Sequence, residues 1–169
     1  MAEREDRNAE HCIDGLFRPV RDRKRAGHHA EAEAAYEWSR RTQRADGSWP
    51  IRTVCGRIED DGVDSNFCAY IAVGVWHHYL ITGDSRFLER MWPVVWSAID
   101  CVLRFRRPDG AFRWGGDHRT GAMFGEALIT GNASIFQALD CAIRIAGEMD
   151  QPDADWIAAH SVLGDAIRA

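Results

Sequence analysis

The sequence lacks the features that mark several classes of protein. No apolar run approaches the roughly 20 residues of a membrane-spanning helix. The first ten residues lack the apolar segment of a secretory signal. Basic residues are not in excess, since the formal net charge is −5, whereas a nucleic-acid binder needs a basic face. We therefore expect neither a membrane nor a nucleic-acid partner.

Cysteines are few and are not spaced as metal ligands. The five cysteines stand at positions 12, 55, 68, 101 and 141, and no pair has the CxxC spacing of a zinc site. The odd number also argues against a complete set of disulfides. We therefore expect free thiols and a cytoplasmic location.

The chain does contain one domain's worth of ordinary globular composition. It has 169 residues, of which 46% are hydrophobic and 28% charged. Residues 1–26 carry many charges of both signs and few large apolar side chains. We expect a poorly ordered lead-in there, followed by a folded domain over residues 27–169.

Helical patterns fill most of that domain. Apolar residues at helical spacing predict amphipathic helices over 28–42, 85–107 and 153–168. The segments 66–81 and 132–148 are mostly apolar, which predicts helices buried on most sides. Pro93 lies inside one amphipathic segment and predicts a kink or a restart. About five helices are therefore expected, joined by long loops at 43–65 and 108–131.

The pattern occurs twice. Asn66 and Asn132 are 66 residues apart, and an Asp-Gly-x-aromatic turn occurs at Asp46 and again at Asp109. Each repeat has this turn, a long loop, a buried helix, a short break and an amphipathic helix. Buried helices that alternate with amphipathic ones predict an inner and an outer layer. The fold class is therefore all-α, with helical hairpins that form part of an α/α toroid.

A closed toroid of six hairpins needs about twelve helices, more than this sequence predicts. The expected barrel is incomplete. Either the chain is a fragment of a longer protein, or it closes by self-association through the open end.

Several motifs resemble the helical barrel of six-hairpin glycosidases, such as glucoamylases and glycogen-debranching enzymes. They are the TGDSRFL segment at 82–88, Met91-Trp92-Pro93, Asp100 and the Asp109-Gly110 turn, with Asp64-Ser65-Asn66-Phe67 before the buried helix. The resemblance extends from about Gly27 to the end. It implies a carbohydrate-active domain that binds a glucan-type glycan, with hydrolysis as the family's reaction and no cofactor.

A second resemblance competes with the first. Gln43, Gly47 and Trp49 have the spacing of the Gln-Trp motif of terpenoid cyclases, which share a similar scaffold with protein prenyltransferases. The segment 60–64 also spells DDxxD, the magnesium–diphosphate motif of prenyl synthases, so this alternative implies magnesium at Asp60, Asp61 and Asp64. That motif works from a helix, whereas Gly62 predicts a loop, so we favour the glycosidase interpretation without a metal. A non-catalytic, truncated helical-repeat fragment is the third alternative.

Both long loops precede buried helices, so they are expected to converge on one mouth of the toroid. Helix N-termini at such a mouth favour anions and carboxylates. Aromatic rings beside carboxylates also suit sugars, which present apolar ring faces and hydroxyl donors. The candidate substrate-binding residues are Trp49, Asp64, Asn66, Trp114, Asp117 and His118.

Glycoside hydrolysis needs two carboxyl groups, one of which is protonated and acts as the acid. Glu126 is the candidate acid, because Gly125-Glu126-Ala127-Leu128 resembles the glutamate segment before an inner helix in the glucoamylase and debranching families. A less polar setting would raise its pKa into the working range. In those families the second carboxylate usually comes from a later hairpin, beyond the last residue of this sequence.

Overall fold

The computed structural model of the chain describes residues 11, 12 and 29–168. The lead-in predicted at 1–26 therefore lies outside the described residues, except for the short strand β1 (His11–Cys12). In the described part of the chain, no helix combines the length and the apolar character needed to cross a membrane.

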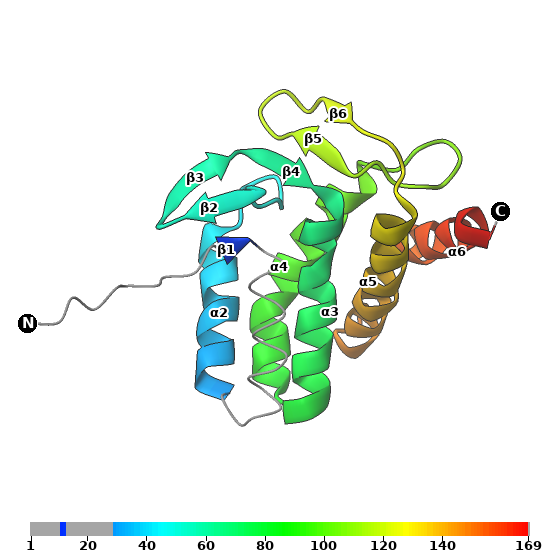
Figure 1. The fold of residues 1–169 in the computed structure, drawn as a ribbon. Coiled ribbons are helices and arrows are strands. Elements are labelled where there is room, and N and C mark those ends of the chain that lie inside the picture. Colours follow the sequence, from blue (N-terminus) through cyan, green and yellow to red (C-terminus); the bar gives the residue numbers. More distant parts are fainter. Residues whose placement is uncertain (1–10, 13–28, 169) are drawn as a thin grey trace, which may run out of the picture.

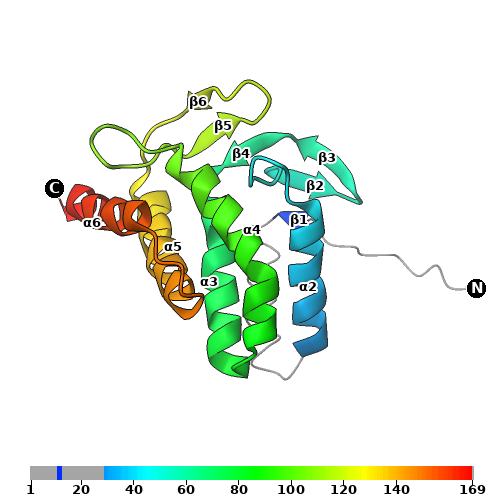
Figure 2. The same cartoon turned by 180° about the vertical axis from the view of Figure 1, so that it is seen from behind.

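Five helices form the body of the described structure, and the expected all-α class is confirmed. They are α2 (His29–Thr42), α3 (Ser65–Thr82), α4 (Ser85–Leu103), α5 (Ile129–Glu148) and α6 (Ala154–Arg168). Helix α3 packs against both α4 and α5, and α5 packs against α6. Figure 1 shows α3 and α5 side by side, with α4 and α6 in a second layer that faces the viewer in Figure 2. Two helical hairpins thus form two layers.

The helix ends follow from local capping. The Asp64 carboxylate accepts a hydrogen bond from the Phe67 N–H and begins α3, and Gly83 ends it in a left-handed conformation. Asp84 then caps α4 by accepting from the Arg86 and Phe87 N–H groups. Helix α4 continues through the exposed Pro93, so that residue does not mark a restart.

The core lies between the two layers. Helix α3 contributes fully buried side chains such as Ile71 and Val75, and α4 contributes Val95 and Ile99. At the junction with the next hairpin, the ring of Trp156 packs against those of Trp92 and Trp96, with centroids 5.8 and 4.9 Å away. This burial explains why the α3 sequence is apolar on nearly all sides.

The long loops contain short strands that the sequence analysis did not predict. They are β2 (Arg52–Val54), β3 (Arg57–Asp60), β4 (Gly62–Asp64), β5 (Gly115–Asp117) and β6 (Met123–Phe124). They form two antiparallel sheets, in the orders β1-β2-β3 and β4-β5-β6. Figure 1 shows all of them at one end of the helical body, where α3 and α5 begin.

The two Asp-Gly turns have the same hydrogen bonds. The Gly47 N–H donates to the Arg44 carbonyl, and the Gly110 N–H donates to the Arg107 carbonyl. The aspartate of each turn accepts a bond from the N–H two residues later: Asp46 from Ser48, and Asp109 from Ala111. Both glycines have positive φ, and each lies directly against the outer helix of its own hairpin, α4 or α6. The sequence repeat is therefore also a structural repeat.

Candidate functional site

The two long loops meet in the sheet β4-β5-β6. Strand β4 comes from the first loop and pairs with β5 from the second, with Val63 opposite Gly116. Ser65, at the start of α3, strengthens this junction, because its N–H donates to the Trp114 carbonyl and its hydroxyl donates to the Arg113 carbonyl. The loops thus form one surface over the beginnings of α3 and α5, as expected of a mouth.

Asp61 is the centre of a charged cluster on this surface. Its carboxylate lies 2.8 Å from Nε2 of His118, which comes from the other loop, and it also pairs with the guanidinium of Arg44. Arg119 lies 3.9 Å away. The hydrogen bond with His118 lowers the pKa of Asp61 from its ordinary value, and the charge of Arg44 adds to that effect. Asp61 is therefore an ionised carboxylate that ties the two loops together.

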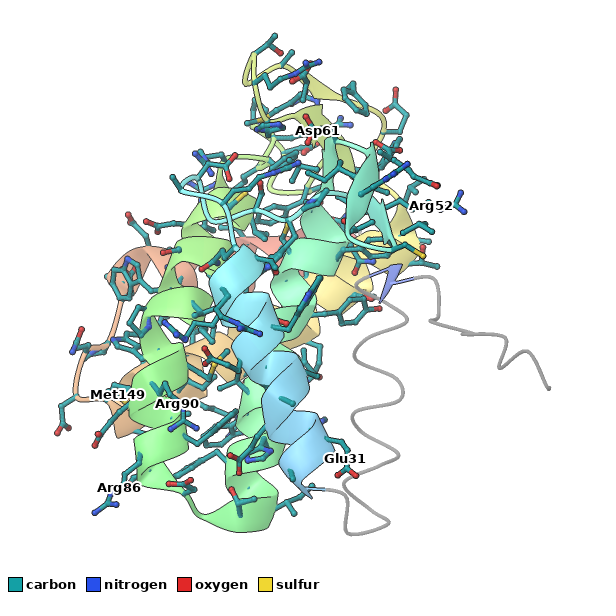
Figure 3. The ribbon with its side chains drawn as sticks, turned by 90° about the vertical axis from the view of Figure 1, so that its left-hand side faces the viewer. Glu31, Arg52, Asp61, Arg86, Arg90 and Met149 are labelled. Carbon is teal, nitrogen blue, oxygen red and sulfur yellow. The ribbon has the colours of Figure 1, made fainter. Side chains whose placement is uncertain are left out.

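A cavity of about 280 Å³ opens beside Asp61. Figure 3 places Asp61 at the strand-bearing end of the molecule, and Glu31 and Arg86 at the opposite end. Carboxylates in such a cavity accept hydrogen bonds from hydroxyl groups, a guanidinium donates them, and a phenyl ring offers an apolar face. The cavity is lined by Asp60, Asp61, Gly62, Gly116, Asp117, Arg119 and Phe124.

The apolar side of the cavity is an aromatic pair held by glycines. The rings of Phe124 and Trp114 meet edge to face, with centroids 5.5 Å apart. Phe124 lies over Gly115, its partner on the neighbouring strand, where an added Cβ would come within 2.8 Å of the ring. Gly125 has φ +83°, and an added Cβ there would lie 2.0 Å from the Trp114 indole nitrogen. Both rings therefore occupy space that only glycine leaves open.

Three of the predicted binding residues lie in this β5–β6 region. Asp117 lines the cavity, and its carboxylate accepts hydrogen bonds from the N–H groups of Arg119 and Thr120. Those bonds lower the pKa of Asp117. His118 contacts Asp61, as described above, and Trp114 supports Phe124.

The other three predicted binding residues lie elsewhere. Trp49 is only 3% exposed, and its indole N–H donates to the Ser39 carbonyl, so it is part of the core. Asp64 caps α3. Asn66 lies in the first turn of α3, where its buried Oδ1 has no hydrogen-bond partner in the described structure. None of these three residues lines the cavity beside Asp61.

Glu126 lies in the exposed connection after β6. Its side chain is 88% exposed, and one carboxylate oxygen lies 3.4 Å from an Arg107 guanidinium nitrogen. The apolar setting that a general acid needs is not present around it in this structure.

The three aspartates of the DDxxD pattern do not converge. Asp60 and Asp64 lie in strands β3 and β4, and Asp61 lies between them. Asp60 accepts from the Gly62 N–H, Asp61 pairs with Arg44 and His118, and Asp64 caps α3. Among residues 11, 12 and 29–168, no group of three or more histidine, cysteine or acidic side chains is placed to hold a metal ion. The extended backbone is the reason, because the motif needs one helical face.

The sequence analysis missed Phe124, Arg44 and Arg119 as members of this site. Arg44 reaches Asp61 only because the first loop folds back on itself, which no local pattern indicates. Phe124 had one weak signal, an aromatic residue beside a glycine in a glycine-rich loop.

Comparison with known proteins adds one sequence relative and three structures. No protein-family model matches the chain. The chain is 51% identical, over 136 residues, to an MMP endo-(1,4)-3-O-methyl-α-D-mannosidase of Mycolicibacterium hassiacum. That match covers 80% of this chain and 37% of the relative, so the chain spans well under half of the relative's length.

The structural neighbours share the fold at low identity. A glycoside hydrolase family 76 mannosidase from Bacteroides thetaiotaomicron aligns with a TM-score of 0.64 at 12% identity, over 95% of this chain and 44% of that one. An unsaturated glucuronyl hydrolase aligns at 0.63 and 17%, over 98% and 48%. A D-mannose isomerase aligns at 0.63 and 14%, over 91% and 38%. All three are α/α toroids, so this chain has the fold of part of an α/α toroid, as its motifs predicted.

Proposed function

We propose that this chain forms part of the substrate site of a glycoside hydrolase that acts on mannose-type glycans. The observation that carries the proposal is the cavity beside Asp61, which joins carboxylates, a guanidinium and an aromatic ring at the mouth of a partial toroid. The relative with 51% identity is a mannosidase, which supports the carbohydrate class. It also replaces the glucan-type substrate predicted from the sequence with a mannan-type one.

The residues of the cavity have complementary roles in this proposal. Asp60, Asp61 and Asp117 accept hydrogen bonds from sugar hydroxyls, and Arg119 donates to ring or hydroxyl oxygens. Phe124 packs against an apolar face of the sugar. Ionised Asp61 suits a carboxylate that binds or stabilises positive charge, whereas the acid must carry a proton. Glu126 remains the proposed acid, on its resemblance to the family's glutamate.

The proposal is tested by ligand binding and then by hydrolysis. A 1,4-linked oligosaccharide of 3-O-methyl-α-D-mannose, at about a hundred times its Kd, should stabilise the chain by about 2.7 kcal/mol and raise its melting temperature. Asp61→Asn should remove most of that rise. Asp165→Asn, on the exposed side of α6, is the matched control and should keep it.

Hydrolysis separates the role of Glu126 from binding. In an assay protein that also provides the second carboxyl group, chromatography of the reaction products should show that Glu126→Gln lowers the rate of cleavage by about a hundredfold or more. If Glu126→Gln cleaves at the original rate, Glu126 is not the acid. A rise in melting temperature with magnesium and a prenyl diphosphate, but not with the glycan, would overturn the proposal in favour of the prenyltransferase alternative.

Two further parts of the proposal concern the state of the protein. Cys55, Cys68, Cys101 and Cys141 are free thiols, which supports the reducing cytoplasm proposed as its location. Light scattering on a sizing column tests whether the open end of the toroid leads to self-association.

A further inference from the structure

The cavity beside Asp61 has one apolar side chain among charged ones. Its lining consists of the carboxylates of Asp60, Asp61 and Asp117, the guanidinium of Arg119, the backbone at Gly62 and Gly116, and the ring of Phe124. A ligand in this cavity therefore meets charged groups and a single apolar ring.

The Phe124 ring is a fixed surface rather than a mobile one. It lies over Gly115 and against the edge of Trp114, and Gly125 leaves room for that indole. Nevertheless, Phe124 is 43% exposed, so much of the residue is open to a ligand. A rigid, exposed ring loses little conformational entropy on binding, which makes it an effective contact for a small apolar group.

A methyl ether is the sugar substituent that distinguishes the Phe124 ring from the charged groups of the lining. A free hydroxyl donates a hydrogen bond to a carboxylate, whereas a methyl ether has no proton to donate. Placed against carboxylates alone, a methyl ether would leave acceptors without donors. Placed against a phenyl ring, its methyl group is removed from water, which is favourable.

We propose that Phe124 selects an O-methylated sugar unit, with the methyl ether against the Phe124 ring and the free hydroxyls facing Asp60, Asp61 and Asp117. This inference rests on the proposed function and deepens it, because it names the substrate class as a partly methylated mannoside. One methyl group in an apolar contact gives about a four- to tenfold preference over the hydroxyl compound.

The experiment measures the Kd of two ligands that differ only in the methyl group. They are 1,4-linked α-D-mannotetraose and the same tetrasaccharide with 3-O-methyl groups, titrated into the full chain by calorimetry. Phe124→Ala removes the ring. Phe124→Gln also removes the ring but keeps a side chain over Gly115, and it is the second variant in case Phe124→Ala does not fold. Met123→Ala is the matched control, since neighbouring Met123 is not among the residues that line the cavity beside Asp61 and lines the adjoining cavity near Cys101 and Arg104.

The expected result is a preference of about four- to tenfold for the methylated ligand in the unaltered chain and in Met123→Ala, and none in the Phe124 variants. Equal binding of both ligands, or a preference that persists in a folded Phe124 variant, overturns the inference and leaves the proposed function standing. Binding of neither ligand by a chain that unfolds cooperatively overturns the proposed function as well.

Discussion

Three glycines with left-handed backbone conformations provide a graded test of how the turns are fixed. Gly83, Gly110 and Gly47 have φ values of +63°, +87° and +85°. An added Cβ would meet nothing within 4 Å at Gly83 and would lie 2.4 Å from a Val162 methyl group at Gly110. At Gly47 it would lie 1.9 Å from the Ser97 carbonyl oxygen. The same substitution therefore meets empty space, a side chain and a backbone.

The expected losses of stability follow from these contacts. Alanine in a left-handed conformation costs about 1–2 kcal/mol, and Gly83→Ala should lose only that much. At Gly110 the half-exposed Val162 side chain can move, so we expect about 2–3 kcal/mol. At Gly47 the backbone of α4 must shift, which adds the cost of overpacking and gives about 3–5 kcal/mol. For a domain of this size, each kcal/mol lowers the melting temperature by about 2–4 °C.

Urea unfolding followed by circular dichroism at 222 nm measures all three losses. Gly83→Ala provides the internal reference, because it carries the backbone cost without a steric contact. The order Gly83, Gly110, Gly47 is the essential result. If Gly47→Ala loses no more stability than Gly83→Ala, the contact with Ser97 does not fix the turn, and the reasoning is refuted.

Two further predictions concern the loops. Asn132→Ala should lower the free energy of unfolding by about 2–4 kcal/mol, because the buried Asn132 amide bonds both the N–H and the carbonyl of Phe112, which would lose their partner. In the same urea assay Asn66→Ala should lower it by less than about 1 kcal/mol, since the Asn66 Oδ1 has no partner to lose. Equal losses for the two variants would contradict this explanation. Because contacts with His118, Arg44 and Arg119 hold the pKa of Asp61 below its unfolded value, its contribution is present above about pH 4 and is lost as the pH falls through the folded pKa. Asp61→Asn should therefore lower the urea midpoint at pH 7 and have a smaller effect at pH 3, and an equal effect at both pH values would exclude the ionised pair.

The helices could be predicted because their signals are local. The helical spacing of apolar residues and the capping residues predicted the ends of α2 and α3 to within one residue, since each helix buries a face that its own sequence defines. The predicted end of α4 was wrong, because the helix stops at Leu103 rather than Arg107. The chain turns there so that Phe105 and Phe112 are buried, which depends on the next hairpin rather than on local sequence.

The candidate site could be predicted only in part, because its contacts are long-range. Asp61 and His118 are far apart in sequence and meet only because β4 pairs with β5. Those strands are three residues long and rich in glycine, so they lack the alternation that predicts a strand. The aspartates were found as residue types, but whether each one caps a helix, forms an ion pair or faces a cavity was decided by this pairing.

The two repeats hold the same turn with different side chains, which explains where the function can vary. In the second repeat the amide of Asn132 binds the backbone of Phe112. In the first, the indole N–H of Trp49 itself donates to the Ser39 carbonyl. Each turn aromatic is thus fixed at the beginning of its loop, and the inner helix fixes the end. Between these anchors, the loop backbone needs only to satisfy its own polar groups, which it does by pairing β4 with β5. The side chains on and beside that sheet are not needed to hold the turns, and the charged cluster around Asp61 and the Phe124 ring lie there and not on the repeated helices.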